Sequence, residues 1–407
     1  MKILFLANKL PHAEIAGSHR LIYNRMIRLK SLGHQIGIIA LTNNNDKKIK
    51  STLNNIFDEV ITIPFKERSL INRINDYINP LLPAIFWKNK SNSMMKKIGE
   101  IIQKSNYEII ISEFGEMGLY LYRNPYLPAI HKIVSCHRCL TDSFNKYICT
   151  SGVSFILKLK CKLQLKRVRE YEFEMYNAMD HILTLTNEDR LNILNYSPQL
   201  PISVVPPGID IKELNLSNTA KKPKYPLIIM CGYFDNKSNR DAALWFIKSI
   251  WPLIFSKNNK IRCWFIGKGI SHDMLKIGSQ ISNITMIADI DDLRPYRKSA
   301  SVFINPMRLG SGLRIKILEA MGSGLPVVST SLGAAGIPVQ NGENCFIADT
   351  PKEFSDAILW MLKDKKLAQK IGENGKKMVE NKYEINKCIK QLESICNDTI
   401  SLSTLKN

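Results

Sequence analysis

The sequence predicts an α/β protein of two facing, Rossmann-like, doubly wound domains with a ligand cleft between them. Short apolar runs alternate with helix-length amphipathic segments along the chain, which is typical of βαβ units and parallel sheets. At 407 residues the chain is too long for one ordinary core. A polar stretch without periodicity, residues 213–226, separates two such series of elements. Because parallel sheets bind ligands at the carboxyl ends of their strands, we expect the cleft there.

The first series predicts an N-terminal domain over residues 1–215 with a Rossmann-like opening. Between its first two strands, Leu21, Met26 and Leu29 follow helical spacing, and Gly33 is placed to end that helix. Seven strands are expected in this domain: KILFLA (2–7), QIGIIAL (35–41), EVITIPF (59–65), EIIISEF (108–114), HKIVSC (131–136), HILTLT (181–186) and ISVVPP (202–207).

The second series predicts another Rossmann-like domain, over residues 226–382, after a linker at 216–225. The tail, 383–407, has a helical pattern with a polar end, and we expect it to pack back on the first domain. Six strands are expected in the second domain: PLIIMCG (226–232), IRCWFIG (261–267), NITMIA (283–288), SVFINP (301–306), LPVVST (325–330) and NCFIA (344–348).

A formal charge of +21 predicts attraction to polyanions. No zinc-finger, RNP1 or basic-zipper pattern accompanies this charge, which disfavours specific nucleic-acid binding. The densest basic cluster is LKLKCKLQLKRVR, residues 157–169. Two interpretations of this cluster stay open: a solvated helix face, and a site for the anionic lipids of an inner membrane leaflet.

The chain predicts a cytoplasmic protein, peripheral at the inner face of the cytoplasmic membrane where the basic cluster meets lipid. The opening residues MKILFLAN are too short for a secretory apolar region, and no apolar run approaches the roughly 18–20 residues of a membrane span. The nine cysteines are scattered, as in a reducing compartment. Cys136 and Cys139 form a single CxxC without a redox context, so we expect no metal or redox site there.

Residues 301–330, SVFINPMRLGSGLRIKILEAMGSGLPVVST, are the most informative segment. A strand leads into a loop with Gly310 and Gly312, and then into the helix LRIKILEAM. Glycines let backbone N–H groups approach an anion closely, and a helix N-terminus adds partial positive charge. The segment therefore predicts a phosphate cradle, formed by Gly310, Ser311, Gly312 and Leu313.

Lys316 lies in the first turn of the expected helix, where its charge opposes the helix dipole. This position favours a compensating anion such as a diphosphate. The alternative is a surface salt bridge to Glu319, three residues later on the same flank.

The string NPMRLGSGLRIKILEAMGSGLPVVSTSLGAAGI resembles the donor-binding signature of the family 4 (group 1) retaining glycosyltransferases, in the branch whose loop follows PxRxGSGxRxKxLEAM. CGYFDNKSNRDAALWFIKSIWP, DIDDLRPYRKSASVF and VVPPGID extend the resemblance over about residues 202–363. It implies the GT-B fold, an acceptor-binding first domain, a donor-binding second domain and retention of anomeric configuration. It also implies a nucleotide-diphosphate sugar as co-substrate, with no further cofactor and no metal.

By this resemblance Glu319 accepts hydrogen bonds from the ribose hydroxyls of the donor, as a carboxylate suits a vicinal diol. The family's second glutamate, eight positions earlier, is replaced here by Ser311. The usual Arg and Lys of the first loop are replaced by Tyr233 and Asn239. We therefore expect Arg314 and Lys316 of the signature to supply the positive charge that binds the diphosphate. Asn239 is expected to lie beside the diphosphate.

In the first domain, Ala16, Gly17 and Ser18 occupy the place of the family's small-residue loop near the transferred sugar. Gly17 as an ordinary turn residue is the alternative. His137 resembles the family histidine that faces the donor sugar and its phosphate, and a purely structural histidine is the alternative. Glu113 is a further candidate because it ends a strand.

The resemblance implies a hexosyltransferase acting on a cell-envelope polysaccharide, lipopolysaccharide or lipid-linked acceptor. The leaving diphosphate gains negative charge, which the helix dipole, the glycine-loop amides, Arg314 and Lys316 are placed to stabilise without a metal, with His137 as a further catalytic residue. Two alternatives differ in class: a nucleotide-sugar 2-epimerase of the same architecture, which the full signature disfavours, and a basic nucleic-acid-binding protein.

Overall fold

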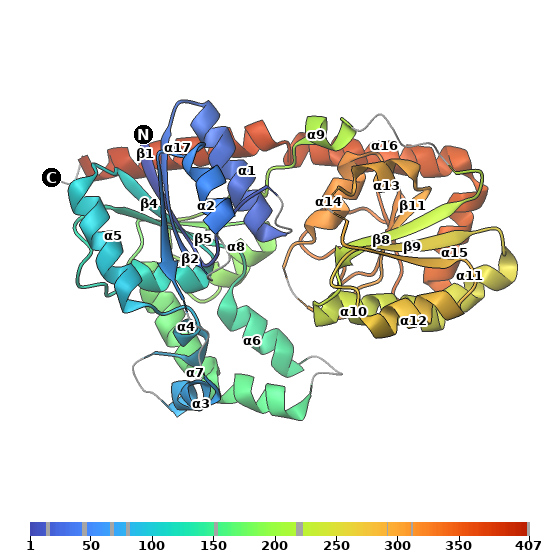
Figure 1. Cartoon of the computed structure of the whole chain (residues 1–407), viewed down its shortest axis with the longest axis horizontal. Coiled ribbons are helices and arrows are strands. Elements are labelled where there is room, and N and C mark those ends of the chain that lie inside the picture. The colour runs from blue at the N-terminus through green and yellow to red at the C-terminus, as the bar shows by residue number, and fades with distance from the viewer. Residues whose placement is uncertain are drawn as a thin grey trace. The chain divides into compact units, whose positions relative to one another are not determined.

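The computed structural model of the chain describes residues 1–13, 17–42, 47–65, 69–78, 82–149, 154–216, 223–290, 292–310 and 312–404. The chain divides into two compact units, one of Met1–Pro206 with Cys388–Asn407 and the other of Pro207–Lys387. Each unit is a parallel sheet with helices (Figure 1). The predicted α/β class with two Rossmann-like, doubly wound domains is confirmed.

The sheet of unit 1 has the strand order β3-β2-β1-β4-β5-β6-β7, and every pairing is parallel. The order reverses between β1 and β4, which makes the carboxyl ends of these strands the switch point where such sheets bind ligands. All seven predicted strands form: β1 Lys2–Ala7, β2 Gln35–Thr42, β3 Glu59–Pro64, β4 Ile109–Glu113, β5 His131–Cys136, β6 His181–Thr184 and β7 Ile202–Val204.

Helices connect these strands, and the last helix of the chain returns to unit 1. The nitrogen Nε2 of His34 lies 2.7 Å from a carboxylate oxygen of Glu393, and the Gln391 side chain donates to the Val204 carbonyl at 2.8 Å. The helices are α1 Ser18–Ser31, α2 Lys47–Asn54, α3 Leu70–Ile78, α4 Ala84–Trp87, α5 Asn92–Lys104, the 3-10 helix η1 Gly115–Tyr120, α6 Leu140–Cys149, α7 Phe155–Asn177, α8 Asn187–Leu194 and α17 Ile385–Thr404.

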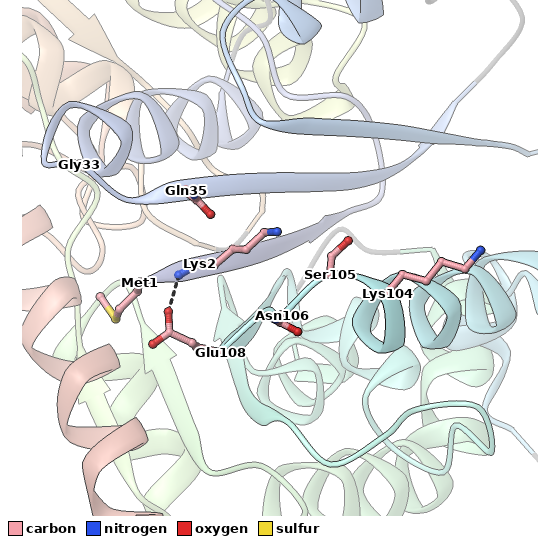
Figure 2. Close-up of a pocket in the computed structure, with 8 residues that line it drawn as sticks. All are labelled: Met1, Lys2, Gly33, Gln35, Lys104, Ser105, Asn106 and Glu108. Atoms are coloured by element: carbon pink, nitrogen blue, oxygen red, sulfur yellow. Dashed lines mark hydrogen bonds between the residues drawn. The ribbon is translucent and has the colours of Figure 1, made fainter.

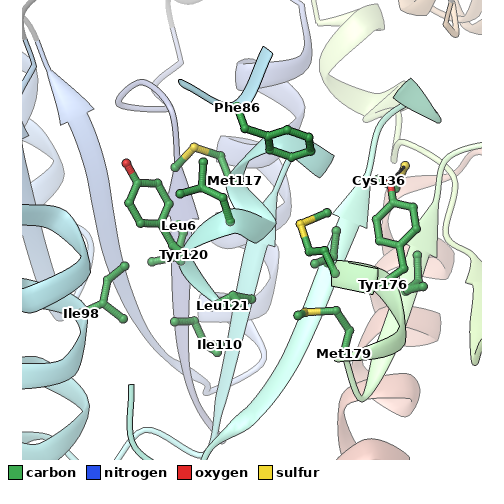
Figure 3. Close-up of a cluster of buried hydrophobic side chains, with 14 of the residues drawn as sticks. Leu6, Phe86, Ile98, Ile110, Met117, Tyr120, Leu121, Cys136, Tyr176 and Met179 are labelled. Carbon is green, nitrogen blue, oxygen red and sulfur yellow. Dashed lines mark hydrogen bonds between the residues drawn. The ribbon is translucent and has the colours of Figure 1, made fainter. Parts of the chain in front are cut away.

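The main core of unit 1 lies where η1, α4, α5 and α7 cover one face of the sheet (Figure 3). Leu6 of β1 and Ile110 of β4 are fully buried there, together with Tyr120 of η1. Full burial of one such side chain stabilises the fold by about 1.5–3 kcal/mol. Gly118 allows η1 to approach α7, because a Cβ at this position would lie 2.7 Å from the sulfur of Met175.

The sheet of unit 2 has the strand order β10-β9-β8-β11-β12-β13, again all parallel, with its switch point between β8 and β11. All six predicted strands form, with β13 shortened to two residues. They are β8 Leu227–Tyr233, β9 Arg262–Lys268, β10 Ile284–Ala288, β11 Val302–Asn305, β12 Val327–Ser329 and β13 Phe346–Ile347.

The helices of unit 2 cover both faces of its sheet, over two separate apolar clusters. A π-helical turn, η2, precedes Pro252, which has no N–H to donate to the preceding turn. The helices are α9 Ile211–Asn215, α10 Lys237–Trp245, η2 Phe246–Ile250, α11 Trp251–Lys257, α12 His272–Gln280, α13 Arg294–Ser299, α14 Ile315–Gly322, α15 Pro351–Lys363 and α16 Lys365–Lys382.

The division between the units falls ahead of residue 215, the expected end of the first domain. Ile209 is buried in an apolar cluster of unit 2, and α9 packs against α14. This segment therefore belongs to unit 2, while residues 217–222 of the expected linker lie outside the described residues. Among the helices that the structure describes, none is long and apolar enough to cross a membrane.

Candidate functional site

The glycine loop of unit 2 joins the carboxyl end of β11 to the start of α14. Gly310 and Gly312 adopt positive φ angles of 102° and 85°, a region that favours glycine. A Cβ at Gly310 would lie 2.8 Å from a guanidinium nitrogen of Arg314, so the loop fits closely around that side chain. Ser311, expected in the same cradle, lies outside the described residues.

Lys316 and Asn239 meet beside this loop, although they are far apart in sequence. The Lys316 amine donates to the Asn239 side-chain oxygen at 2.8 Å, and the Asn239 amide donates to the Tyr233 carbonyl at 2.9 Å. Asn239 lies in the first turn of α10, which follows β8, and Lys316 lies in the first turn of α14, which follows β11. Both residues therefore lie at the switch point of the sheet.

Burial of the Lys316 amine, together with the nearby charge of Arg314, lowers the pKa of Lys316 to about 7. Two helix N-termini, α10 and α14, begin at this point and add partial positive charge. The arrangement gathers positive charge at the switch point of the sheet. It is suited to an anionic ligand such as a diphosphate.

Glu319 lies one turn after Lys316 on α14 but pairs with a different residue. A carboxylate oxygen of Glu319 accepts from the Arg297 guanidinium at 2.9 Å, with Arg297 buried and Glu319 24% exposed. Arg297 thus fixes the orientation of a carboxylate that solvent, or a ligand, can still reach. Leu313, the last expected member of the cradle, is partly buried against the apolar cluster beneath α14.

Two further arginines near the loop make contacts of their own. Arg308 forms two hydrogen bonds to Asp241, at 2.8 and 3.2 Å, and its guanidinium lies 4.9 Å from the centre of the Trp245 ring. Arg240 donates to the Phe234 carbonyl at 3.3 Å. These contacts hold Arg308 beside an acidic partner, whereas Lys316 has a neutral one.

In unit 1, His137 and Glu113 come together at the carboxyl ends of β5 and β4. The His137 nitrogen Nε2 lies 2.9 Å from one carboxylate oxygen of the fully buried Glu113, and Arg25 of α1 donates to the other at 2.7 Å. Arg25 also donates to Ser135 at 3.2 Å. Burial alone raises the pKa of Glu113, but the charge of Arg25 and the hydrogen bond from His137 outweigh it and lower that pKa to about 2. Glu113 is therefore an ionised carboxylate.

Only one of the two ring nitrogens of His137 has a hydrogen-bond partner among the described residues. Its side chain is 9% exposed, and within the part of the chain that the structure describes its nitrogen Nδ1 is buried without a hydrogen-bond partner. Its ring lies 4.3 Å from that of Phe114, between ring centres. A buried polar nitrogen without a partner is costly, which points to a ligand that supplies one.

His19 extends this polar cluster toward β1. Its nitrogen Nε2 lies 2.7 Å from the side-chain oxygen of Asn8, the residue that follows β1. Burial, with the nearby charges of Lys9 and His137, lowers the pKa of His19 to about 4, so His19 is neutral near pH 7. Gly17, with a φ of 75°, directly precedes α1, and Ala16 lies outside the described residues.

Sequence reasoning missed Arg25, His19 and Asn8. Arg25 carries a readable signal, because it is a charged residue among the buried apolar positions Ile22 and Met26 of α1. His19 and Asn8 flank the loop after the first strand, where Rossmann-like sheets bind ligands. Neither signal specifies a partner until the fold brings β1, β4 and β5 side by side.

An open pocket lies at the opposite edge of the unit 1 sheet, at the amino ends of β1 and β2 (Figure 2). The Lys2 amide donates to the Glu108 carboxylate at 2.7 Å across it. The lining is mostly polar and lies away from the carboxyl ends of the strands, where Rossmann-like sheets bind ligands. The lining residues are Met1, Lys2, Gly33, Gln35, Lys104, Ser105, Asn106 and Glu108.

Cys136 and Cys139 of the CxxC are both buried as free thiols. The Cys136 sulfur lies 3.0 Å from the Tyr176 hydroxyl, and burial raises the pKa of the Cys136 thiol well above its usual range. Within the described ranges, no group of three or more histidine, cysteine or acidic residues is arranged to hold a metal ion.

Comparison with known proteins shows which family model and which proteins this chain resembles. Residues 225–364, most of unit 2, match the family model described as "Glycosyl transferases group 1". An uncharacterized 44.6 kDa protein of the cps region of Klebsiella pneumoniae is 23% identical, over 95% of this chain and 97% of its own. The capsular polysaccharide biosynthesis glycosyltransferase CapM of Staphylococcus aureus is 25% identical, over 52% of this chain and 57% of its own.

Solved structures share the fold over nearly the whole chain. Sucrose-phosphate synthase from Thermosynechococcus elongatus superimposes with a TM-score of 0.71 at 15% identity, covering 98% of this chain and 99% of its own. Anabaena HepE in complex with UDP-glucose superimposes with a TM-score of 0.66 at 13% identity, covering 98% and 100%. The GT-B fold is confirmed, and the chain is a glycosyltransferase, as the signature predicts.

Proposed function

We propose that this glycosyltransferase moves a hexose from a nucleotide-diphosphate donor to a saccharide acceptor of the bacterial envelope, with retention of configuration as the family 4 resemblance implies. The observation that carries this proposal is the pairing of Lys316 with Asn239 beside Gly310. There a lysine of lowered pKa, two helix N-termini and an arginine converge on one point. This is a diphosphate site by its chemistry.

The donor diphosphate binds the loop of Gly310 and Gly312, and Arg314 and Lys316 neutralise its charge. The same groups stabilise the leaving diphosphate more strongly as its charge grows in the transition state. Glu319, held by Arg297, accepts from the ribose hydroxyls of the donor. Anabaena HepE, which shares this fold, has been solved with UDP-glucose, which supports a nucleotide-sugar donor.

His137 offers its unpartnered nitrogen Nδ1 to a hydroxyl or phosphate of a substrate. Because the ionised Glu113 accepts from Nε2, a neutral His137 presents Nδ1 as an acceptor, and a protonated one presents it as a donor. Arg25 keeps Glu113 ionised and thereby holds the orientation of the imidazole. His137 is the substrate-binding residue of this group, and Arg25 and Glu113 position it.

The envelope acceptor is supported by the relatives. CapM is described as a capsular polysaccharide biosynthesis glycosyltransferase, and the Klebsiella relative is described as a protein of a cps region. An acceptor that is a polysaccharide, a lipopolysaccharide or a lipid-linked saccharide fits these descriptions. The comparisons do not favour the predicted epimerase alternative.

A screen of nucleotide sugars tests the donor proposal on the full chain. UDP-, GDP-, ADP-, CMP- and dTDP-sugars are compared by thermal melting in the presence of EDTA, each with its free nucleotide. A true donor at 100 times its dissociation constant adds about 2.7 kcal/mol of stability, which is a readable shift in melting temperature. We expect one base to stabilise the chain more than the others. Equal melting temperatures with every nucleotide would contradict the proposed donor site.

A further inference from the structure

Helix α7 shows two apolar faces, of which only one is buried by unit 1. Successive residues of a helix are about 100° apart, so Phe155, Leu159 and Leu163 form one stripe, with Ile156 at its edge. Three members of this stripe, Phe155, Ile156 and Leu163, are 78%, 66% and 67% exposed. The opposite face, with Cys161 and Val168, is buried. Residues of the two apolar faces alternate along positions 157–169, so the sequence pattern of this segment shows no single apolar stripe.

Helix α3 adds a second exposed apolar pair at the same end of unit 1 (Figure 1). Ile71 and Ile74, three residues apart on one helical face, are 72% and 63% exposed. Helix α3 packs against α4, and the Ala84 amide at the start of α4 donates to the Gln164 side chain of α7 at 3.2 Å. The apolar stripe of α7 and the apolar pair of α3 therefore belong to one connected part of the unit. We call them together the α3–α7 surface.

The charge around the α7 stripe has a single sign. Between Phe155 and Arg169 the sequence holds six basic residues and no acidic one. The first acidic residue after them, Glu170, lies 3.9 Å from the Lys166 amine. By helical spacing, five of these cations lie along the two borders of the stripe, and the sixth, Lys166, continues the stripe beyond Leu163. The six basic residues are Lys158, Lys160, Lys162, Lys166, Arg167 and Arg169.

We propose that the α3–α7 surface binds an anionic lipid bilayer. Exposed aromatic and aliphatic side chains flanked by lysines are the composition of a helix that lies in a membrane interface. Contiguous exposed apolar side chains mark interaction sites, and the basic flanks select an acidic partner. A second copy of the chain is a poorer occupant, because it would bring twelve cations together, six from each copy.

The α3–α7 surface is structurally joined to the polar cluster of His137. Helix α6 begins three residues after His137 and packs against α7. The buried Glu172 of α7 accepts from the amides of Leu140 and Thr141, at 2.7 and 2.8 Å, at the start of α6. A bilayer bound by α7 would therefore be held on the unit that carries His137. That the bilayer carries a lipid-linked acceptor rests on the proposed function. That the α3–α7 surface binds a bilayer does not rest on the proposed function.

Vesicle sedimentation with the full chain tests the proposal. We expect the parent to bind phosphatidylcholine vesicles that contain phosphatidylglycerol at least about tenfold more tightly than pure phosphatidylcholine, with binding weakened by salt. Two triple variants separate the contributions: Phe155→Ser with Leu159→Ser and Leu163→Ser, and Lys158→Gln with Lys162→Gln and Lys166→Gln. Each should lose about tenfold in affinity for the acidic vesicles.

A matched control carries Lys365→Gln, Lys366→Gln and Lys370→Gln on the exposed part of α16, and it should bind vesicles like the parent. Because the altered side chains are exposed, apart from the half-buried Lys158, every variant should melt within a few degrees of the parent. Equal binding of neutral and acidic vesicles, or undiminished binding by both α7 variants, would overturn the proposal. So would a dimer that depends on the stripe without vesicle binding. Donor hydrolysis measured without vesicles should be the same in the α7 variants as in the parent. If the parent itself hydrolysed no donor, this result would contradict the proposed function and leave the proposal of bilayer binding standing.

Discussion

We predict that donor binding is linked to the protonation of Lys316. Its pKa of about 7 means that near neutral pH the amine is divided between charged and neutral forms. A bound diphosphate favours the charged form, so the complex takes up a proton where the free enzyme is largely neutral, at about pH 8. Donor affinity should accordingly be highest below about pH 7 and weaken as the pH rises through that value.

Calorimetry measures this proton uptake directly, with the binding nucleotide titrated in buffers of different ionisation enthalpy. The parent should take up part of a proton at about pH 8, and Lys316→Arg should take up less because its guanidinium is already charged. The same proton count in both proteins would mean that the Lys316 amine does not contact the diphosphate.

Glu113 is a buried carboxylate that stabilises the fold through Arg25. Its folded pKa, about 2, lies below the ordinary 4.5, so its contribution is present above pH 4.5 and is lost as the pH falls toward 2. Glu113→Gln leaves Arg25 buried without its counter-charge and should destabilise the chain by about 3 kcal/mol near pH 7. It should also flatten the loss of stability between these two pH values.

Denaturant unfolding at several pH values checks this prediction. Glu116→Gln serves as its control, because Glu116 pairs with the more exposed Arg138 at 3.1 Å and should cost less than about 1 kcal/mol. If both variants lose the same unfolding free energy, the buried pair of Arg25 and Glu113 stabilises the fold no more than the more exposed pair of Arg138 and Glu116.

The family resemblance indicates His137, and its place at the end of a strand indicates Glu113; the fold brings the two side chains within 2.9 Å of each other. The sequence does not indicate their dependence on Arg25, because Arg25 is 88 residues away from Glu113 along the chain and lies on a helix that otherwise follows the apolar pattern. Long-range polar pairing of this kind depends on strand order, which periodicity does not encode.

At the scale of elements, Glu172 joins α7 to α6. Its carboxylate accepts from the Leu140 and Thr141 amides, from the Thr141 hydroxyl and from the Tyr176 hydroxyl. Burial raises the pKa of Glu172, whereas these hydrogen bonds favour the ionised form. The start of α6 therefore depends on an acceptor supplied by another helix.

Glu172→Gln replaces one acceptor oxygen by an NH2 group, which would face N–H and O–H donors without an acceptor. We therefore predict a loss of about 1–3 kcal/mol in unfolding free energy. Amide exchange at Leu140 and Thr141 should speed up more than at positions in β1. The exposed Glu170→Gln is the matched control on the same helix. Unchanged exchange at Leu140 and Thr141 would show that α6 is capped independently of Glu172.

All thirteen predicted strands form, because each is a short apolar run; the inner strands, such as β4 and β11, are buried on both faces, and the edge strands are only partly buried. The ends differ for local reasons. HILTLT stops at Thr184, since the Thr186 side chain accepts from the Asp189 amide and begins α8. ISVVPP stops at Val204, ahead of two prolines that cannot donate to a ladder. Apolar patterning thus predicts the existence of a strand better than its last residue.

At the scale of the whole molecule, the two units differ in how far sequence explains them. Unit 2 carries a contiguous signature, and residues 225–364 match a family model. The polar cluster of unit 1 is assembled from β1, α1, β4 and β5, so no single segment of sequence carries it. A motif therefore predicts where the donor binds, whereas the unit 1 cluster becomes visible only in the fold.

We propose that Lys316 and Arg314 hold the diphosphate of the donor while the sugar is transferred. Turnover, followed as release of nucleoside diphosphate in the presence of acceptor, measures their contribution. Lys316→Ala and Arg314→Ala should each lower the turnover rate by at least about tenfold, with a smaller change in donor affinity, because their interactions strengthen as the leaving group gains charge. The exposed Lys365→Ala should turn over like the parent. Full turnover by both Lys316→Ala and Arg314→Ala would contradict the claim and move the diphosphate to other residues, with Arg308 and Arg240 the next to test.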